Sequence, residues 1–343
     1  MGTPPGAKAA DTLQPAEPII DTLDHAPWNH PMTTRQALDA RASSLMLLLC
    51  LLWGLQQVVL KATAHDIAPI MQIGLRSGAA AVLLGLWMLW RKERMSLTDG
   101  TLRAGLMVGA LFALEFLLVG EGLRHTSASH AVVFLYTAPI FVALGLHIKL
   151  PAERLSWVQW AGIGLAFTGI VLTFFGRSQA ASSTLGPAMM MLWGDALALL
   201  AGMAWAATTV VVRCSALASA PASQTLMYQL VGAFVLLMLA ATVLGQAHIH
   251  FTPMVWGSLV FQSVIVSFAS FLAWFWLLRH YLASRLGVFS FLTPLFGMGF
   301  GVWLLGEPLE PRFVLGAVLV LAGVLLVSSQ GWLVAAKTRR ARA

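Results

Sequence analysis

The chain has 343 residues, of which 58% are hydrophobic and only 10% are charged. A soluble domain carries about 25% charged residues, so the composition excludes a water-soluble globular protein. Apolar runs of about 20 residues recur along the chain, which is the length that crosses the hydrocarbon core of a bilayer. The net charge is +7, but where the charges lie relative to these apolar runs matters more than their number. We therefore expect membrane lipid around the protein and no nucleic-acid partner.

The first segment, residues 1–41, is polar and proline-rich and predicts a disordered cytoplasmic tail. It does not combine a basic start with an apolar core, so no secretory signal is expected and the first apolar run remains as a membrane helix. Ten membrane helices are predicted over residues 44–62, 69–90, 102–123, 127–148, 156–175, 189–212, 223–245, 253–278, 284–305 and 312–334. Residues 177–188 are expected to form a linker and residues 335–343 a basic C-terminal tail.

The lysines and arginines indicate the orientation of these helices, because cytoplasmic segments are enriched in them. With the N-terminus in the cytoplasm, the inner segments hold 16 of the 21 basic residues and the outer segments hold four, while Arg76 lies within a predicted helix. Both termini are therefore predicted to be cytoplasmic. Cys50 and Cys214 lie in or beside apolar runs, and two isolated thiols predict neither a disulfide framework nor a metal site.

The two halves of the chain, residues 42–176 and 189–334, repeat one pattern at a spacing of 152 to 155 residues. The matches are Trp53 with Trp205, Lys61 with Arg213, Ser129 with Ser284, Pro139 with Pro294, Glu153 with Glu307, Leu155 with Leu309, Gly162 with Gly316 and Gly169 with Gly323. Each half holds five predicted helices, and an odd number makes the second copy enter the membrane from the opposite side. The predicted fold is an all-α integral membrane protein with ten transmembrane helices in two inverted five-helix repeats. That plan is typical of secondary transporters with a substrate site near the midplane.

Four stretches of the sequence resemble one known family. They are LLWG at 51–54, TSASHAVVFLYTAPIF at 126–141, GDALALLAGMAWAATTVVVR at 194–213 and LASRLGVFSFLTPLFGMGFGVWLLGEPL at 282–309. Over about residues 42–334 the chain resembles the EamA-type branch of the drug/metabolite transporter superfamily. The resemblance implies a carrier of small metabolites, often outward across the bacterial inner membrane, with a cavity framed by both repeats. The first copy departs from the pattern, because Lys149-Leu-Pro stands where the second copy has Leu-Gly-Glu-Pro.

Ionisable residues inside membrane helices are costly, so they indicate candidate functional sites. In the predicted helices they are Arg76, Glu115, Glu121 and Asp195. Arg76 and Glu115 lie at a similar depth of about 10–12 Å on consecutive antiparallel helices. One hypothesis is a structural Arg76–Glu115 ion pair, with Glu121 and Asp195 at the interface. The other is that Glu115 or Glu121 binds a cationic substrate or an exchanged proton, while Arg76 binds a substrate carboxylate.

Uncharged polar and aromatic residues complete the predicted cavity, and aromatic walls with a few amides suit amphipathic metabolites or flat rings. These candidates are Trp53, Gln56, Gln57, Tyr136, Trp205, Thr208, Tyr228, Gln229, Gln262, Trp274, Trp276 and Ser290. Helix packing alone would also retain the repeat-matched Trp53 and Trp205. Tryptophans near the ends of the predicted helices are discounted, because indole normally anchors at the membrane interface.

Two further pairs of matched residues have candidate roles. Pro139 and Pro294 each remove a backbone donor in mid-span, so they are hinge candidates, or else they merely bend the helix. Glu153 and Glu307 sit at a helix-to-helix turn, where a carboxylate is expected to cap the following helix.

Catalysis is not expected from this sequence. His248 and His250 lie in an outer loop without a nearby third ligand, so no metal is predicted, and no glycine-rich phosphate loop is present, so no nucleotide or other cofactor is expected. The predicted function is secondary active transport of amino acids, amines or drug-like compounds, as a monomer or homodimer, with protons as a candidate coupling ion. Uptake or facilitated exchange, and a non-transporting membrane sensor or scaffold, remain the alternatives.

Overall fold

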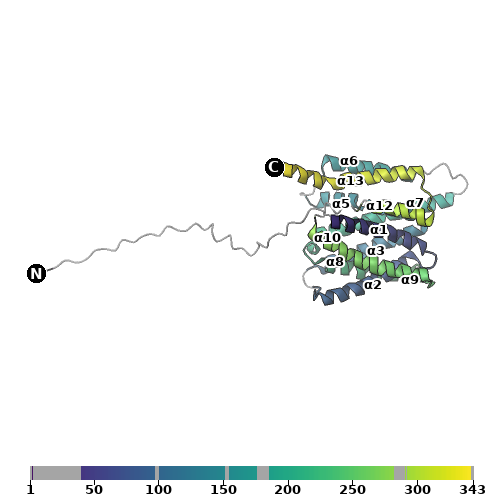
Figure 1. The fold of residues 1–343 in the computed structure, drawn as a ribbon, viewed down its shortest axis with the longest axis horizontal. Helices are drawn as coiled ribbons and strands as arrows, with labels where there is room; N and C mark the ends of the chain where they lie inside the picture. The colour runs from purple at the N-terminus through teal and green to yellow at the C-terminus, as the bar shows by residue number, and fades with distance from the viewer. Residues whose placement is uncertain are drawn as a thin grey trace. The chain divides into compact units, whose positions relative to one another are not determined.

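The structure is a computed structural model, and it describes Gly2 and residues 40–96, 100–150, 154–175, 185–281, 290 and 292–340. The regular secondary structure of these residues is helical, apart from isolated bridge residues such as the pair Ile67 and Ile249. Seven helical stretches are long and apolar enough to cross a membrane, and three shorter apolar helices accompany them over Trp157–Thr173, Leu292–Leu305 and Pro311–Val327. The chain is an all-helical, multi-pass membrane protein whose helices lie side by side (Figure 1).

The helices follow the predicted spans closely. In chain order they are α1 (Ala40–Ala62), α2 (Pro69–Trp90), α3 (Leu102–His125), α4 (Ala128–Leu135), α5 (Ala138–Lys149), α6 (Trp157–Phe175), α7 (Leu185–Arg213), η3 (Ala216–Ala218), α8 (Ala222–Val243), α9 (Pro253–Val260), η4 (Phe261–Ser270), α10 (Phe271–His280), α12 (Leu292–Leu305) and α13 (Pro311–Arg340). α1 begins four residues before its predicted start, and α13 continues to Arg340, so residues 335–340 of the expected C-terminal tail are helical.

Some of the predicted features fall outside the described residues. They are Met1 and residues 3–39 of the N-terminal tail, residues 177–184 of the linker, the C-terminal residues 341–343, Glu153, and residues 284–289 and 291 of the helix predicted over 284–305, which include Ser284. The described chain resumes with α7 at Leu185, which lies within the expected linker. The outer end of the bundle is defined as the end that holds the α1–α2 and α3–α4 turns, and the inner end is the opposite one.

The span predicted at 127–148 is two half-helices rather than one. The α4 helix ends before Tyr136 and Thr137, and the Thr137 hydroxyl donates a hydrogen bond to the Phe134 carbonyl at 2.6 Å. Pro139 lies in the first turn of α5, where an N–H would have had no intrahelical partner. Pro294 likewise lies in the first turn of α12. Both hinge candidates therefore lie in the first turn of a described helix.

The span predicted at 253–278 is also irregular. Its middle, η4, is a ten-residue π-helix between α9 and α10. π-helices are rare and are often found at functional sites, because the wider turn changes which side chains face a neighbour. Gln262, Ser263, Ser267 and Ser270 on η4 are all buried.

Helices α6 and α13 meet through glycines. A Cβ atom on Gly162 would lie 2.8 Å from the carbonyl oxygen of Gly323, and one on Gly169 would lie 2.5 Å from that of Gly316. The order of these contacts along the two helices is reversed, so α6 and α13 run antiparallel. Small residues let helix backbones approach closely within a membrane, where packing takes over from the hydrophobic effect.

The buried apolar residues are divided unevenly between the two ends. One large cluster joins α1, α2, α3 and α8 at the outer end, through residues such as Leu60, Ile70, Leu123 and Leu237, and it continues along α6 and α13 as far as Ile163 and Val327. Three smaller clusters lie toward the inner end. One joins α1 to α10, a second joins α2 to α8, and a third joins α3 to α8 and η3. The apolar packing is therefore continuous at the outer end and along α6 and α13, whereas the other helices form separate groups toward the inner end.

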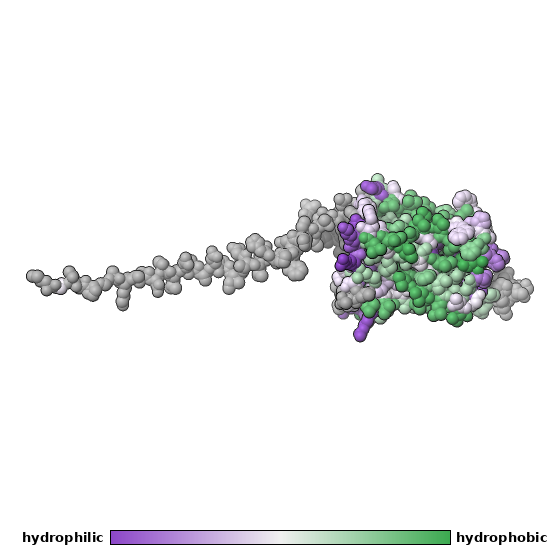
Figure 2. Space-filling model, turned by 90° about the horizontal axis from the view of Figure 1, so that it is seen from below, coloured by the Kyte–Doolittle hydropathy of each residue, from purple (hydrophilic) through white to green (hydrophobic). Residues whose placement is uncertain are grey.

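Apolar side chains also cover the outside of the bundle. Figure 2 shows a continuous hydrophobic band across the helical part of the chain, with hydrophilic residues gathered at its two ends. Large apolar side chains such as Val82, Leu106, Leu239 and Trp303 are more than half exposed. This band is the surface that faces lipid, because apolar side chains need no burial in hydrocarbon.

The α6–α13 contact predicts a difference between two glycines of the same helix. Gly169→Ala places a methyl group against the backbone of α13 and is expected to destabilise the protein by about 1–3 kcal/mol. Gly164→Ala is the matched control, because a Cβ atom there would meet nothing within 4 Å. The measurement is the thermal midpoint of detergent-solubilised protein by size-exclusion chromatography. Equal midpoints for the two variants would contradict the close approach.

Candidate functional site

Arg76 lies at the centre of a polar cluster between three helices. Its side chain is 3% exposed, and Nη1 donates hydrogen bonds to Oε1 of Gln56 on α1 at 3.1 Å and to Oε1 of Gln262 on η4 at 2.5 Å. The Gln262 amide nitrogen in turn donates to the backbone carbonyl of Gln56 at 2.9 Å. On another side, the guanidinium carbon lies 4.7 Å from the ring centroid of Phe116, a cation–π distance.

Glu115 precedes Phe116 on α3 and is 5% exposed. Its charge is close enough to interact with that of Arg76, yet the two described side chains do not form an ion pair within 4.0 Å. Oε2 of Glu115 and Nε of Arg76 are buried and have no hydrogen-bond partner among the described residues. The arrangement therefore offers one buried acceptor and one buried donor of opposite charge.

A second polar layer lies one helical turn further out. The Thr63 hydroxyl on α1 donates to Oε1 of Gln72 on α2 at 2.8 Å, and the Gln72 amide nitrogen donates to the Ser258 hydroxyl on α9. Gln72 is four residues before Arg76, and Ser258 is four residues before Gln262, so the two layers are about 6 Å apart along these helices. Gln72 and Ser258 were not among the predicted site residues, because uncharged polar residues are common in membrane helices.

The candidate aromatic residues form two edge-to-face pairs. Trp53 meets Trp274 at a centroid distance of 5.6 Å, and its indole nitrogen donates to the Ser270 hydroxyl of η4 at 2.9 Å. Tyr136, at the break between α4 and α5, meets Trp205 of α7 at 5.3 Å. The repeat-matched Trp53 and Trp205 are thus each half-buried against an aromatic partner from the other half of the chain.

The other candidates are dispersed. Gln57 is 1% exposed, and its buried Oε1 has no hydrogen-bond partner in the described part of the chain. Thr208 donates to the Ala204 carbonyl of its own helix. The remaining members of the predicted set are Tyr228, which packs on Gly105 of α3; Trp276, which is 36% exposed beneath Arg41; and Gln229 and Ser290, which are half-buried.

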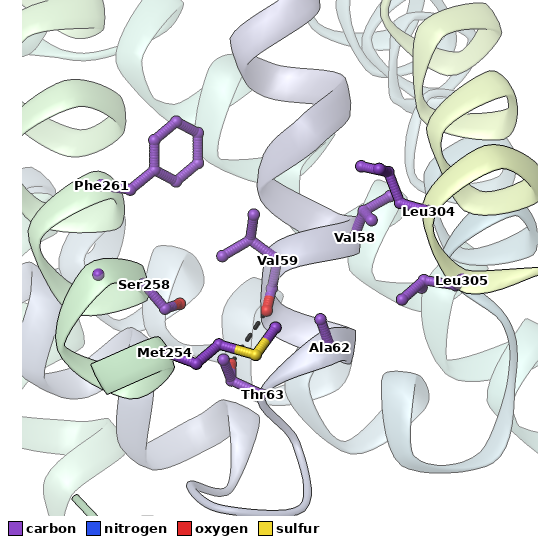
Figure 3. Close-up of a pocket in the computed structure, with 10 residues that line it drawn as sticks. Val58, Val59, Ala62, Thr63, Met254, Ser258, Phe261, Leu304 and Leu305 are labelled. Atoms are coloured by element: carbon purple, nitrogen blue, oxygen red, sulfur yellow. Dashed lines mark hydrogen bonds between the residues drawn. The ribbon is translucent and has the colours of Figure 1, made fainter. Parts of the chain in front are cut away.

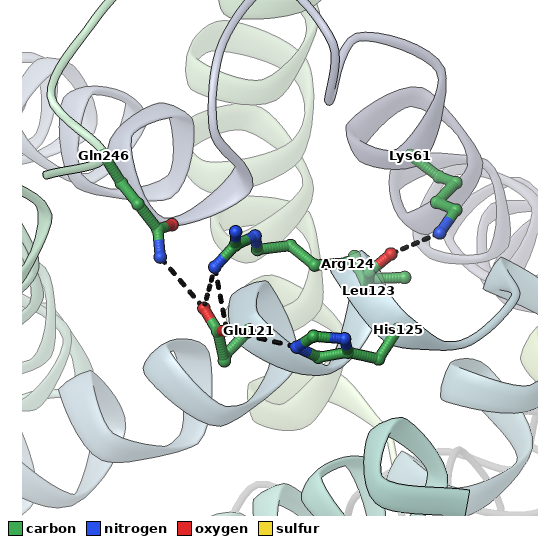
Figure 4. A network of polar contacts seen from close by, with 6 residues as sticks. All are labelled: Lys61, Glu121, Leu123, Arg124, His125 and Gln246. Atoms are coloured by element: carbon green, nitrogen blue, oxygen red, sulfur yellow. Dashed lines mark hydrogen bonds and ion pairs between the residues drawn. The ribbon is translucent and has the colours of Figure 1, made fainter. Parts of the chain in front are cut away.

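Glu121 belongs to a separate cluster at the outer end of α3. Its carboxylate accepts hydrogen bonds from Arg124 at 2.8 Å and from Gln246 at 3.0 Å, and His125 lies 3.3 Å away (Figure 4). Gln246 comes from the α8–α9 connection, so this cluster joins the two halves of the chain. Glu121 is thus already supplied with partners, whereas Glu115 keeps a carboxylate oxygen without one among the described residues.

Charged residues from other helices hold the α3–α4 turn at the outer end. The Lys61 ammonium of α1 donates to the carbonyls of Leu123 and Thr126. Oε1 of Glu307 accepts from the Ala128 amide at 2.6 Å, and Oε2 accepts from the Ser129 amide and hydroxyl at 2.9 and 2.6 Å. A carboxylate at this position stabilises the start of α4, because the first amides of a helix lack intrahelical partners.

This geometry corrects one prediction. Glu307 was expected to cap the helix that follows it, but it caps α4, which lies 178 residues away in the other half of the chain. The reason is that α12 and α4 pack side by side, which brings the turn after α12 to the start of α4. A Cβ atom on Gly301 would lie 2.5 Å from Oε2 of Glu307, so the glycine leaves the space that the carboxylate occupies.

A buried histidine was missed from the sequence. His130 of α4 is 2% exposed and lies 3.0 Å from the carboxylate of Asp195 on α7, which is fully buried and also accepts from the Thr126 hydroxyl. The His130 ring stacks on Phe313 of α13 at 3.7 Å. Asp195 is therefore buried inside the protein, beside the α3–α4 turn at the outer end. Counting histidine among the ionisable residues of the predicted helices would have identified its partner.

The bundle also has an apolar groove at its outer end. The groove has a volume of about 370 Å³ and lies between α1, α9 and α12 (Figure 3). Its lining is Val58, Val59, Ala62, Thr63, Met254, Gly257, Ser258, Phe261, Leu304 and Leu305. The hydroxyls of Thr63 and Ser258 both hydrogen-bond Gln72, so the groove presents mainly aliphatic and aromatic surface.

Comparison with known proteins gives a consistent result. The EamA-like transporter family matches residues 40–175 and again residues 192–329. An uncharacterized transporter of Bacillus subtilis, YoaV, is 24% identical over 80% of this chain and 92% of its own length. A probable amino-acid metabolite efflux pump of Escherichia coli is 28% identical over 82% of this chain and 93% of its own. A crystal structure with 17% identity has the same fold, with a TM-score of 0.58 over 84% of this chain and 96% of that one.

The cap on α4 predicts a graded loss of stability. Glu307→Ala removes three charge-assisted hydrogen bonds, each worth about 1.5–3 kcal/mol, and is expected to cost at least about 2 kcal/mol. Ser129→Ala removes only the hydroxyl contact and is expected to cost about 1 kcal/mol. Both are measured as thermal midpoints in detergent against the native protein. A loss for Glu307→Ala no larger than that for Ser129→Ala would show that the backbone contacts contribute nothing.

Proposed function

Because the chain belongs to the EamA-like transporter family, a family of transporters and not of enzymes, we propose that it exports amino acids or related amines across the bacterial inner membrane. The observation that carries this proposal is the unpaired Arg76 and Glu115. Both are buried at the meeting point of helices from the two halves, and each keeps one polar atom without a partner among the described residues. An amino acid carries the two complementary groups, a carboxylate for Arg76 and an ammonium for Glu115. The name of the Escherichia coli relative supports this class of cargo.

The proposed architecture is two inverted repeats of five helices, residues 42–176 and 189–334, with both termini in the cytoplasm. The two family matches support the duplication. The reversed order of the Gly162–Gly323 and Gly169–Gly316 contacts supports the inversion, because a two-fold axis between α6 and α13 exchanges these pairs. The excess of basic residues in the inner segments supports the orientation and the inner-membrane location. Alternating access then follows from rocking one repeat against the other.

The proposed energy source is a proton gradient. Glu115 binds either the ammonium of the cargo or a proton, but not both, so protonation releases the cargo and cargo binding releases the proton. Competition of two cations for one carboxylate is sufficient for exchange. Glu121 is the other candidate from the sequence, but Arg124, His125 and Gln246 already surround its carboxylate. We therefore assign the exchange to Glu115.

The test is accumulation of labelled compounds by inside-out membrane vesicles with and without a proton gradient. The central set is L-phenylalanine, phenethylamine, which lacks the carboxylate, and 3-phenylpropionate, which lacks the ammonium; other amino acids and aromatic drugs complete the panel. Arg76→Gln and Glu115→Gln are each expected to lower phenylalanine accumulation roughly tenfold to a hundredfold, because each removes a charged interaction of about 1.5–3 kcal/mol.

Two comparisons make the result specific. Glu121→Gln is the matched control, and it is expected to keep accumulation within about a factor of three, since an exposed charge pair is worth under about 1 kcal/mol. Phenethylamine is expected to compete with phenylalanine in Arg76→Gln but not in Glu115→Gln, and 3-phenylpropionate is expected to do the reverse. Accumulation that survives loss of the gradient would refute proton exchange. Folded native protein that accumulates nothing would refute export and favour the sensor or scaffold.

A further inference from the structure

The segment formed by α9 and η4 is attached to the first half of the chain by a ladder of polar contacts. At the outer tip, the Thr252 hydroxyl donates to Asp66 at 3.2 Å. Further in, Ser258 meets Gln72, and then Gln262 meets Arg76 and Gln56. At the end of η4, Ser270 accepts from Trp53. Polar contacts of this kind can be exchanged for other polar partners, whereas the glycine contacts between α6 and α13 cannot.

The outer rungs of this ladder lie beside the large apolar cluster, which includes Val58 of α1, Ile70 of α2 and Val255 of α9. Arg76 and Gln262 form the innermost contact of the ladder on α2, so a molecule that reaches Arg76 from the inner side meets this contact first.

Space for movement lies on the other side of α9. The groove of about 370 Å³ separates α9 from α12, and Met254 and Leu304 on its two walls are 57% and 48% exposed (Figure 3). The π-helical geometry of η4 begins directly after α9, and such a wide turn is a site where a helix can change its course. The segment thus has exchangeable contacts on one face and room on the other.

We propose that Gln262 is a latch that holds α9 and η4 against α1 and α2 until the cargo takes Arg76. This inference rests on the proposed function, because it assigns the cargo carboxylate to Arg76. A carboxylate is a stronger acceptor for a guanidinium than an amide oxygen is, so the cargo replaces Gln262 on Arg76. Once the Arg76–Gln262 hydrogen bond is broken, the bond from Gln262 to the Gln56 carbonyl is no longer supported. The α9–η4 segment then moves away from α2 and toward α12.

The experiment measures the separation of α9 and α12 directly. Nitroxide labels are placed at Met254→Cys and Leu304→Cys in a chain with Cys50→Ala and Cys214→Ser, and the spin–spin broadening is recorded in detergent. Gln262→Leu removes the latch, so it is expected to bring the labels closer without any cargo. Gln262→Glu forms an ion pair with Arg76 and is expected to keep the labels apart even with saturating L-phenylalanine. The native latch is expected to release only when L-phenylalanine is added.

Matched controls separate the latch from a general loosening. Gln72→Leu breaks the neighbouring rung without touching Arg76, so L-phenylalanine is still expected to be required for the change. Labels at Val171→Cys and Val318→Cys, on α6 and α13, are expected to keep their spectrum in every variant. If the labels in cargo-free Gln262→Leu stay as far apart as they are in the cargo-free native protein, the latch is refuted. If Gln262→Leu moves the labels but L-phenylalanine never moves them in the native protein, the mechanical role stands and the proposed binding of the cargo to Arg76 fails.

Discussion

A polar group inside the hydrocarbon must find its partner within the protein, because no water is available to replace it. Several polar contacts of this bundle satisfy that constraint across the boundary between the two halves of the chain. The first amides of α4 are satisfied by Glu307, and the Thr126 hydroxyl is satisfied by Asp195. Because these contacts join segments more than 60 residues apart, they also fix how the halves are placed. Arg76 and Glu115 are charged exceptions, since each keeps a buried polar atom without a partner in the described residues, as the uncharged Gln57 also does.

Two kinds of helix contact divide the bundle by mechanical role. Glycine contacts bring backbones within van der Waals distance and tolerate no sliding, as between α6 and α13 or between Gly109 of α3 and Gly232 of α8. Side-chain hydrogen bonds bridge a wider separation and can be broken one at a time, as between α9–η4 and the first two helices. A transporter needs both kinds, because one part must stay rigid while another moves. The distribution of contacts therefore separates the frame from the moving part.

The sequence was sufficient to predict most helices, because the length and apolarity of α1, α2, α3 and α8 are local properties. The break at Tyr136 and Thr137 was not predicted, since a proline three residues after Tyr136 is compatible with either a kinked helix or a new helix start. The site was predicted in part: Gln56, Arg76, Glu115 and Gln262 were all candidates, but their arrangement was not. Arg76 and Gln262 are 186 residues apart, and no local pattern reveals which side chains the packing will bring together.

The contact between α6 and α13 has a consequence for how such a chain can arise. Gly162 meets Gly323, and Gly169 meets Gly316. The repeat-matched glycines therefore lie at corresponding places on the two contacting faces of α6 and α13. An interface of that kind is isologous, and it needs only one sequence to form. A single five-helix polypeptide, inserted in the membrane in both orientations, would make this contact with a second copy of itself. Fusion of two such genes would then preserve the interface and leave each copy free to acquire different polar residues.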